Sequence, residues 1–78
     1  MPRRGPTPEP TALAFGEAVH RCRLARDETL EDVAGRIRSM DPAYLGEIER
    51  GWHAPTVTTA KRIADALKLP LSELVRDI

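Results

Sequence analysis

The sequence predicts an all-α fold, a compact domain of five short helices. Three observations lead to this prediction. Ala, Leu, Arg and Glu are abundant among the 78 residues, and all four favour helices. Trp, Tyr and Phe occur once each, so the aromatic residues that strands prefer are scarce. Apolar residues recur at spacings of three and four along the chain, as they do on one face of a helix.

Length and composition also limit the class of protein. Seventy-eight residues form one domain, and a core this small leaves room for a second subunit to contribute buried surface. The 12 basic and 12 acidic residues cancel, so a nucleic-acid partner would need a local basic patch. The single cysteine, Cys22, excludes an internal disulfide framework and a cysteine-rich zinc site. No run approaches the ~20 apolar residues of a membrane span. A cytoplasmic protein without a metal or cofactor is predicted.

The first ten residues differ in composition from the rest. Prolines are frequent there and apolar periodicity is absent, so residues 1–10 are predicted to form a flexible or extended arm, and residues 11–78 the domain. Thr11 is the predicted N-cap of a first helix that runs to about Arg26. Its apolar positions are Phe15, Val19 and Cys22.

Two short helices with strong start signals are predicted next. Thr29 and Asp32 have the spacing of a capping box. Asp41 and Pro42 begin the third helix with an acidic N-cap and a proline at the first helical position, and Gly51 ends it. The apolar positions are Leu30, Val33, Ala34 and Ile37 in the second helix, and Tyr44, Leu45 and Ile48 in the third.

A fourth helix is predicted from Pro55 and Thr56, and a fifth after Pro70. The apolar face of the fourth comprises Val57, Ala60, Ile63, Ala64 and Leu67; that of the fifth comprises Leu71, Leu74, Val75 and Ile78. The fifth helix is more apolar than the closure of one small core requires. We therefore expect its four apolar residues to form the interface of a homodimer.

Two capped helices joined by a tight turn fit a helix-turn-helix, although many small bundles share that periodicity. More specific signals are the segments GEAVHRCR at 16–23, TLEDVA at 29–34, YLGEIERG at 44–51, PT at 55–56 and IADAL at 63–67. In these segments the chain resembles the phage Cro-and-repressor-like and Xre-type helix-turn-helix regulators. The resemblance implies a protein that binds double-stranded DNA and reads the major groove with its third helix, about residues 42–50.

The resemblance also implies structural roles. Ala34 corresponds to the small residue that lets the two motif helices approach, and Leu45 and Ile48 correspond to core positions of the recognition helix. The family's buried ion pair falls on Arg23 and Glu49. The alternative for these two residues is a pair of solvated surface charges.

The implied DNA-facing residues centre on the third helix. Gly46 would bring the backbone close to the groove or leave room for a neighbouring side chain; the alternative is a tolerated glycine on an exposed face. Glu47 would repel phosphate, but its carboxylate can accept a hydrogen bond from a cytosine amino group. Asp41 and Ala43 belong to the same set. The candidates for phosphate contacts are Tyr44, Arg50, Arg36, Arg38, Trp52 and His53, with a solvated surface position as the alternative for each arginine.

Two departures from the family pattern affect this interface. Arg38 and Ser39 occupy a turn where the family usually has one glycine, and the longer turn should remove the need for a glycine with positive φ. Leu30 stands where the family usually has a glutamine that contacts the DNA backbone. The nearby acids Glu28, Glu31 and Asp32 suit the positive end of the helix dipole but repel phosphates.

The first interpretation is a sequence-specific DNA-binding transcriptional regulator of repressor or controller type. The second is a protein-interaction module on the same fold, such as an antitoxin-like partner-binding protein, which the neutral charge and the acids near the second helix favour. An enzyme ranks third, because neither His20 nor His53 has an evident nucleophile and orienting acid, and His53 has no second metal ligand at a suitable spacing. The sequence leaves open the operator, the regulated genes and the choice between activation and repression.

Overall fold

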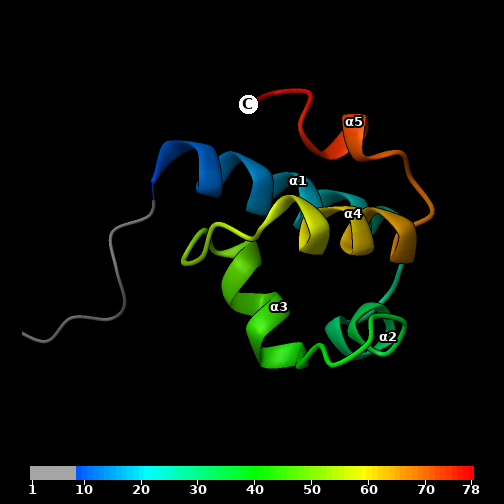
Figure 1. Ribbon diagram of the computed structural model, residues 1–78. Coiled ribbons are helices and arrows are strands. Elements are labelled where there is room, and N and C mark those ends of the chain that lie inside the picture. Colours follow the sequence, from blue (N-terminus) through cyan, green and yellow to red (C-terminus); the bar gives the residue numbers. More distant parts are fainter. Residues whose placement is uncertain (1–8) are drawn as a thin grey trace, which may run out of the picture.

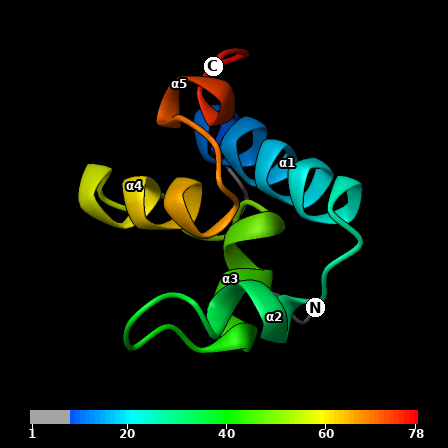
Figure 2. The ribbon, with the colours of Figure 1, turned by 90° about the vertical axis from the view of Figure 1, so that its right-hand side faces the viewer.

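The computed structural model describes residues 9–78, and within this range it contains five helices and no strand. They are α1 (Pro10–Ala25), α2 (Leu30–Ala34), α3 (Pro42–Glu49), α4 (Val57–Ala66) and α5 (Leu71–Leu74). α1, α4 and α5 make up one half of the molecule, and α2 and α3 the other (Figures 1 and 2). The predicted all-α, five-helix fold is confirmed.

The start of α1 differs from the prediction. Glu9 is the N-cap, because its Oε1 accepts a hydrogen bond from the backbone N–H of Ala12 at 3.0 Å, and Pro10 occupies the first turn. Thr11, the predicted cap, therefore lies inside the helix, and the predicted arm over residues 1–10 is one residue too long. The rest of that predicted arm, residues 1–8, lies outside the described residues.

The starts of α2 and α3 are confirmed. Thr29 and Asp32 form both hydrogen bonds of the capping box, at 3.0 and 2.9 Å. Asp41 caps α3 by accepting a hydrogen bond from the backbone N–H of Ala43 at 2.7 Å. Ile37 is buried, but it lies beyond the end of α2, in the turn.

The long turn between α2 and α3 still contains a residue with positive φ, although that residue is not a glycine. Ser39 has φ 61°. The extra residue therefore lengthens the turn, but the chain still needs one residue in the left-handed conformation to reverse its direction, and Ser39 is that residue. Asp27 and Lys68, after α1 and α4, also have positive φ, at 57° and 60°. These three side chains carry a steric cost that glycine would avoid.

α1 and α3 meet at a backbone-to-backbone contact. Gly16 on α1 lies so close to α3 that a Cβ added there would stand 2.2 Å from the carbonyl oxygen of Ile48 and 2.7 Å from that of Glu49. Only glycine permits this approach. The core around the contact is made by buried residues from all five helices, among them Val19, Val33, Leu45, Ile48, Ile63, Leu67 and Leu74.

Two predictions for the C-terminal helices were wrong in part. Val57 is 77% exposed, because it is the first residue of α4 and lies outside the core. The other residues predicted on the same face of α4 are buried. Leu74 is only 1% exposed and belongs to the core of its own chain, so it is not available to a dimer interface. α5 also ends at Leu74, which leaves Val75 and Ile78 beyond the helix, with exposed side chains.

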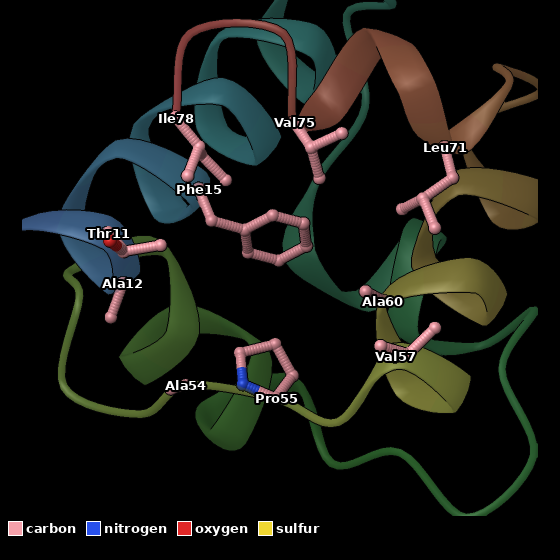
Figure 3. Close-up of a pocket in the computed structure, with 10 residues that line it drawn as sticks. All are labelled: Thr11, Ala12, Phe15, Ala54, Pro55, Val57, Ala60, Leu71, Val75 and Ile78. Carbon is pink, nitrogen blue, oxygen red and sulfur yellow. The ribbon is translucent and has the colours of Figure 1, made fainter.

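An apolar groove of about 180 Å³ lies between the start of α1, the start of α4 and the C-terminal segment (Figure 3). The ring of Phe15 is at its centre (Figure 3). The other lining residues are Thr11, Ala12, Ala54, Pro55, Val57, Ala60, Leu71, Val75 and Ile78. This surface is the apolar groove discussed below.

Candidate nucleic-acid interface

α2 packs against α3, and α3 presents a polar face away from the core. Leu45 and Ile48 are fully buried, whereas Ala43 and Arg50 are exposed and Glu47 is half-buried. Positions 43, 47 and 50 are four and three residues apart, so their side chains share one side of the helix. On this side Glu47 and Arg50 form a short polar stripe along α3.

A Schellman motif at the end of α3 determines where the following loop lies. Gly51, with φ 83°, donates its backbone N–H to the carbonyl of Ile48 at 2.9 Å. Trp52 donates its backbone N–H to the carbonyl of Glu47 at 3.0 Å. The chain thus turns back sharply, and Trp52 and His53 lie beside the last turn of α3.

Glu47 and His53 form a side-chain pair across this turn. Nε2 of His53 lies 2.7 Å from Oε1 of Glu47, and both side chains are half-buried. The ring of His53 also packs against that of Tyr44, with 4.9 Å between centroids and an angle of 31° between planes. Three of the predicted DNA-facing residues therefore form one contiguous cluster.

Arg50 lies over the ring of Trp52, with its Cζ 4.7 Å from the ring centroid, a cation–π contact. Gly46 leaves space for this guanidinium, since a Cβ at that position would be 3.6 Å from Nη1 of Arg50 and 3.3 Å from Cδ1 of Leu30. Gly46 is buried under these two side chains. The alternative of a glycine on an exposed face was therefore wrong, and the contact with DNA stays a prediction.

Arg23 and Glu49 form a buried, bidentate ion pair beneath the interface. Nε of Arg23 donates to Oε2 of Glu49 at 2.7 Å, and Nη2 donates to Oε1 at 3.0 Å. The two residues are 8% and 9% exposed. The hydrogen bond with Glu49 raises the pKa of the Arg23 guanidinium above its ordinary value. A third donor of Arg23, Nη1, reaches the carbonyl of Glu28 at 2.8 Å, so the pair ties together α1, α3 and the link before α2.

Arg36 is engaged elsewhere. Its guanidinium pairs with the carboxylate of Glu28, and Nη1 also donates to the carbonyl of Ala66 at 3.0 Å. The Arg36 and Arg26 guanidinium groups lower the pKa of the Glu28 carboxyl from 4.5 to about 2. Arg36, in the turn after α2, therefore joins the segment before α2 to the end of α4, and its guanidinium is engaged away from the cluster at the end of α3.

Arg38 and Asp41 lie in and after the long turn, away from that cluster. Arg38 is exposed and lines a shallow cleft together with Arg62 of α4. Asp41 is exposed, but its Oδ1 already accepts the capping hydrogen bond of α3.

Three residues near the interface were missed in the sequence. Nδ1 of His20 lies 2.8 Å from Oε1 of Glu49, which makes it a second donor to the buried carboxylate. Its position three residues before Arg23, on the same side of one helix, was an available signal. Glu28 pairs with Arg26 and Arg36, and Arg62 lines a cleft with Arg38; neither carried such a signal, because both arrangements depend on how separate segments pack.

Across residues 9–78, no group of three or more His, Cys, Asp or Glu side chains is arranged to hold a metal ion. No helix in the described part of the chain has the length and apolarity needed to cross a bilayer.

Comparison with known proteins adds independent information. The model of the HTH_3 helix-turn-helix family matches residues 19–74. The transcriptional regulator ClgR of Mycobacterium tuberculosis is 36% identical over 62 residues, which are 80% of this chain and 54% of that protein. This chain thus spans about half the length of the curated relatives it matches.

Solved structures show the same similarity. The restriction-modification controller protein C.AhdI of Aeromonas hydrophila superposes with a TM-score of 0.78 at 26% identity, covering 85% of this chain and 98% of that one. ClgR of Corynebacterium glutamicum gives a TM-score of 0.81 at 27% identity, covering 91% and 73%. The family match covers more than half of the chain and includes both motif helices and the buried ion pair. This chain therefore belongs to the HTH_3 family of helix-turn-helix proteins.

Proposed function

We propose that this domain is a sequence-specific, DNA-binding transcriptional regulator that places α3 in the major groove of double-stranded DNA. The observation that carries the proposal is the cluster at the end of α3, where Tyr44, Glu47 and His53 lie beside Arg50 and Trp52. The ClgR proteins that this chain resembles are regulators of transcription, which supports a regulatory role for this domain. The role is one of binding rather than catalysis, in the cytoplasm.

The residues divide into two kinds of contact. Glu47 faces bases, since a carboxylate has no favourable contact with phosphate but accepts a hydrogen bond from the cytosine amino group. Arg50 and Arg38 supply positive charge to the DNA backbone, and Tyr44 supplies a hydroxyl donor. Arg36 is the weakest of the predicted phosphate contacts, because its guanidinium is already bound to Glu28 and to the carbonyl of Ala66.

The proposal includes a homodimer built around the apolar groove. Val57, Val75 and Ile78 are exposed apolar side chains on or beside this surface, and Leu71 is partly buried. An exposed patch of this kind is unfavourable in water unless a partner covers it. A two-fold dimer would also present two copies of α3, as the reading of paired half-sites about one DNA turn apart requires.

A protein-interaction module remains the second candidate. The first turn of α2 favours it, because Glu31 and Asp32 place two acids where a DNA backbone would approach, whereas the nearby Glu28 is already paired with arginines. In that case the apolar groove would accept a partner protein.

Salt dependence separates the two candidates. Bound sequences would first be selected from a random duplex pool, and affinity for the selected site would then be measured by fluorescence anisotropy from about 50 to 300 mM salt. A DNA-binding protein loses affinity linearly on logarithmic axes, with a slope of about −0.9 per phosphate contacted. Failure to select any sequence, with no salt-dependent binding to duplex DNA, would contradict the proposal.

A further inference from the structure

His53 forms a hydrogen bond with Glu47, the residue that the proposed function assigns to base reading. Its Nε2 lies 2.7 Å from Oε1 of Glu47. A carboxylate only accepts hydrogen bonds, so this ring nitrogen carries the proton and donates. The other carboxylate oxygen, Oε2, accepts no hydrogen bond from any residue in the range 9–78. One oxygen of Glu47 is therefore anchored and the other is available to a ligand.

The position of His53 is determined by the protein itself. On one side its ring packs against Tyr44 of α3, at 4.9 Å between centroids. In addition, the Schellman motif fixes the backbone that precedes His53: Gly51 has φ 83°, and the backbone N–H of Trp52 donates to the carbonyl of Glu47. His53 thus returns from the loop to the same turn of α3 that carries Glu47.

This pair differs from the ordinary surface ion pairs of the same domain. Lys61 pairs with Asp65, and Arg76 pairs with Glu73, between side chains three or four residues apart that are more exposed than those of Glu47 and His53. Glu47 and His53 instead join a helix to a loop, and both are half-buried. The Glu47 side chain is therefore more restricted in its rotamers than a side chain in an exposed ion pair.

We infer that His53 is a positioning residue that determines specificity: it orients Glu47 toward one base pair and does not itself act as a phosphate contact. The inference rests on the proposed function. An unpaired glutamate on a helix surface samples several rotamers, and binding would have to select one of them. His53 makes that selection in the free protein, so the glutamate is preorganised for the groove. The donated hydrogen bond also reduces the repulsion between the carboxylate and nearby phosphates.

The test compares His53→Ala, His53→Gln, Glu47→Ala and the double variant with the wild-type domain. Each protein would select sequences from a random duplex pool, and anisotropy titrations would then compare the wild-type site with its single-base-pair variants. Lys61→Ala, which removes an exposed ion pair on α4, is the matched control and should leave the preference unchanged. Circular dichroism melting would verify that each variant is folded at the assay temperature.

The expected result is specific to one position. His53→Ala should reduce discrimination by roughly tenfold at the same base pair that Glu47→Ala affects. His53→Gln should restore part of it, because the glutamine amide can donate to Oε1. In the Glu47→Ala background, the additional loss of His53 should change nothing at that base pair.

Three outcomes would overturn the inference. If His53→Ala weakens binding to all sequences by one factor, His53 is a phosphate contact. If His53→Ala sharpens the preference, the histidine competes with the base for Glu47. If the two residues affect different base pairs, they act independently. Wild-type protein that selects no motif contradicts the proposed function as well, whereas these three outcomes leave it standing.

Discussion

The guanidinium of Arg23 holds both carboxylate oxygens of Glu49, at 2.7 and 3.0 Å, below the surface of the domain. His20 adds a third contact to the same carboxylate, at 2.8 Å. Glu49 belongs to the helix that we assign to the major groove, and its neighbours Glu47 and Arg50 point away from the core. One helix therefore carries a structural acid and a candidate base-reading acid two residues apart. Burial and partners, not residue type, distinguish them.

Loss of this ion pair should destabilise the fold. Glu49→Ala leaves the Arg23 guanidinium buried without its partner, which typically costs about 3–5 kcal/mol. Urea unfolding followed by circular dichroism measures the change. Asp77→Ala is the control, because Asp77 and Arg21 form an exposed pair at 3.8 Å, whose loss should change the unfolding free energy by less than about 0.5 kcal/mol. A similarly small loss for Glu49→Ala would remove its structural role.

Gly16 should tolerate no side chain. A methyl group there would stand 2.2 Å from the carbonyl oxygen of Ile48, so α1 and α3 would have to separate. We expect Gly16→Ala to lower the unfolding free energy by about 2 kcal/mol or more, although alanine is the better helix former. Glu17→Ala, at the next and exposed position, is the control and should have little effect. Equal stability of the two variants would contradict the close approach of these helices.

The parts of this fold that sequence could predict are those decided locally. Thr29 with Asp32, and Asp41 with Pro42, are capping signals complete within four residues, and the structure has helices starting at both. Glu9 was missed although it too is local, because the proline-rich composition around it suggested an arm. Leu45 and Ile48 were predictable because their spacing and the family pattern agree.

The rest depends on which segments meet in space. No spacing in the sequence joins Arg36 to Glu28 and to the carbonyl of Ala66, because that contact requires α2 and α4 to be packed together. The role of Gly16 likewise depends on the backbone of α3. At the candidate interface, the residues of α3 were predictable from the resemblance, but the pairing of Glu47 with His53 follows from the turn that Gly51 makes.

Acid should weaken the ion pair between Glu28, which precedes α2, and Arg36, which follows it. Interaction with Arg36 and Arg26 lowers the pKa of Glu28 from 4.5 to about 2 in the folded protein. A carboxyl with a depressed folded-state pKa contributes stability above its unfolded pKa and loses it as the pH falls through the folded value. The stability difference between wild type and Glu28→Gln should therefore be largest above pH ~4.5 and shrink toward pH ~2. Urea midpoints measured across this range test it; a difference independent of pH would contradict the ion pair.

If two copies of the domain associate through the apolar groove, dimerisation should depend on the residues that line it. Sedimentation velocity of the wild type at tens of micromolar should show a dimer, and Ile78→Glu should convert it to a monomer, because a charge would be buried at the interface. Leu24→Glu is the control: Leu24 is 55% exposed, close to the 53% of Ile78, but it does not line the groove. A wild-type monomer with and without DNA, or equal effects of the two substitutions, would contradict this interface.

Glu47 and Arg50 should separate specificity from affinity. Replacing Glu47 with Gln or Ala should relax the preference at one base pair by ~1 to 3 kcal/mol, because a hydrogen bond to a cytosine amino group is lost. Binding to unrelated DNA should stay the same or improve, since a negative charge facing phosphates has gone. Arg50→Ala should instead weaken all sequences alike and reduce the salt slope by about one.

The comparison uses the selected site, its single-base-pair variants and an unrelated duplex, each titrated at several salt concentrations. Thr58→Ala, on the exposed side of α4, is the control for substitution itself. If Glu47→Ala lowers affinity for every duplex by one factor, the carboxylate stabilises the interface but does not read a base. If the selected motif is unchanged, Glu47 does not face the groove, and the polar stripe of α3 cannot be the reading surface.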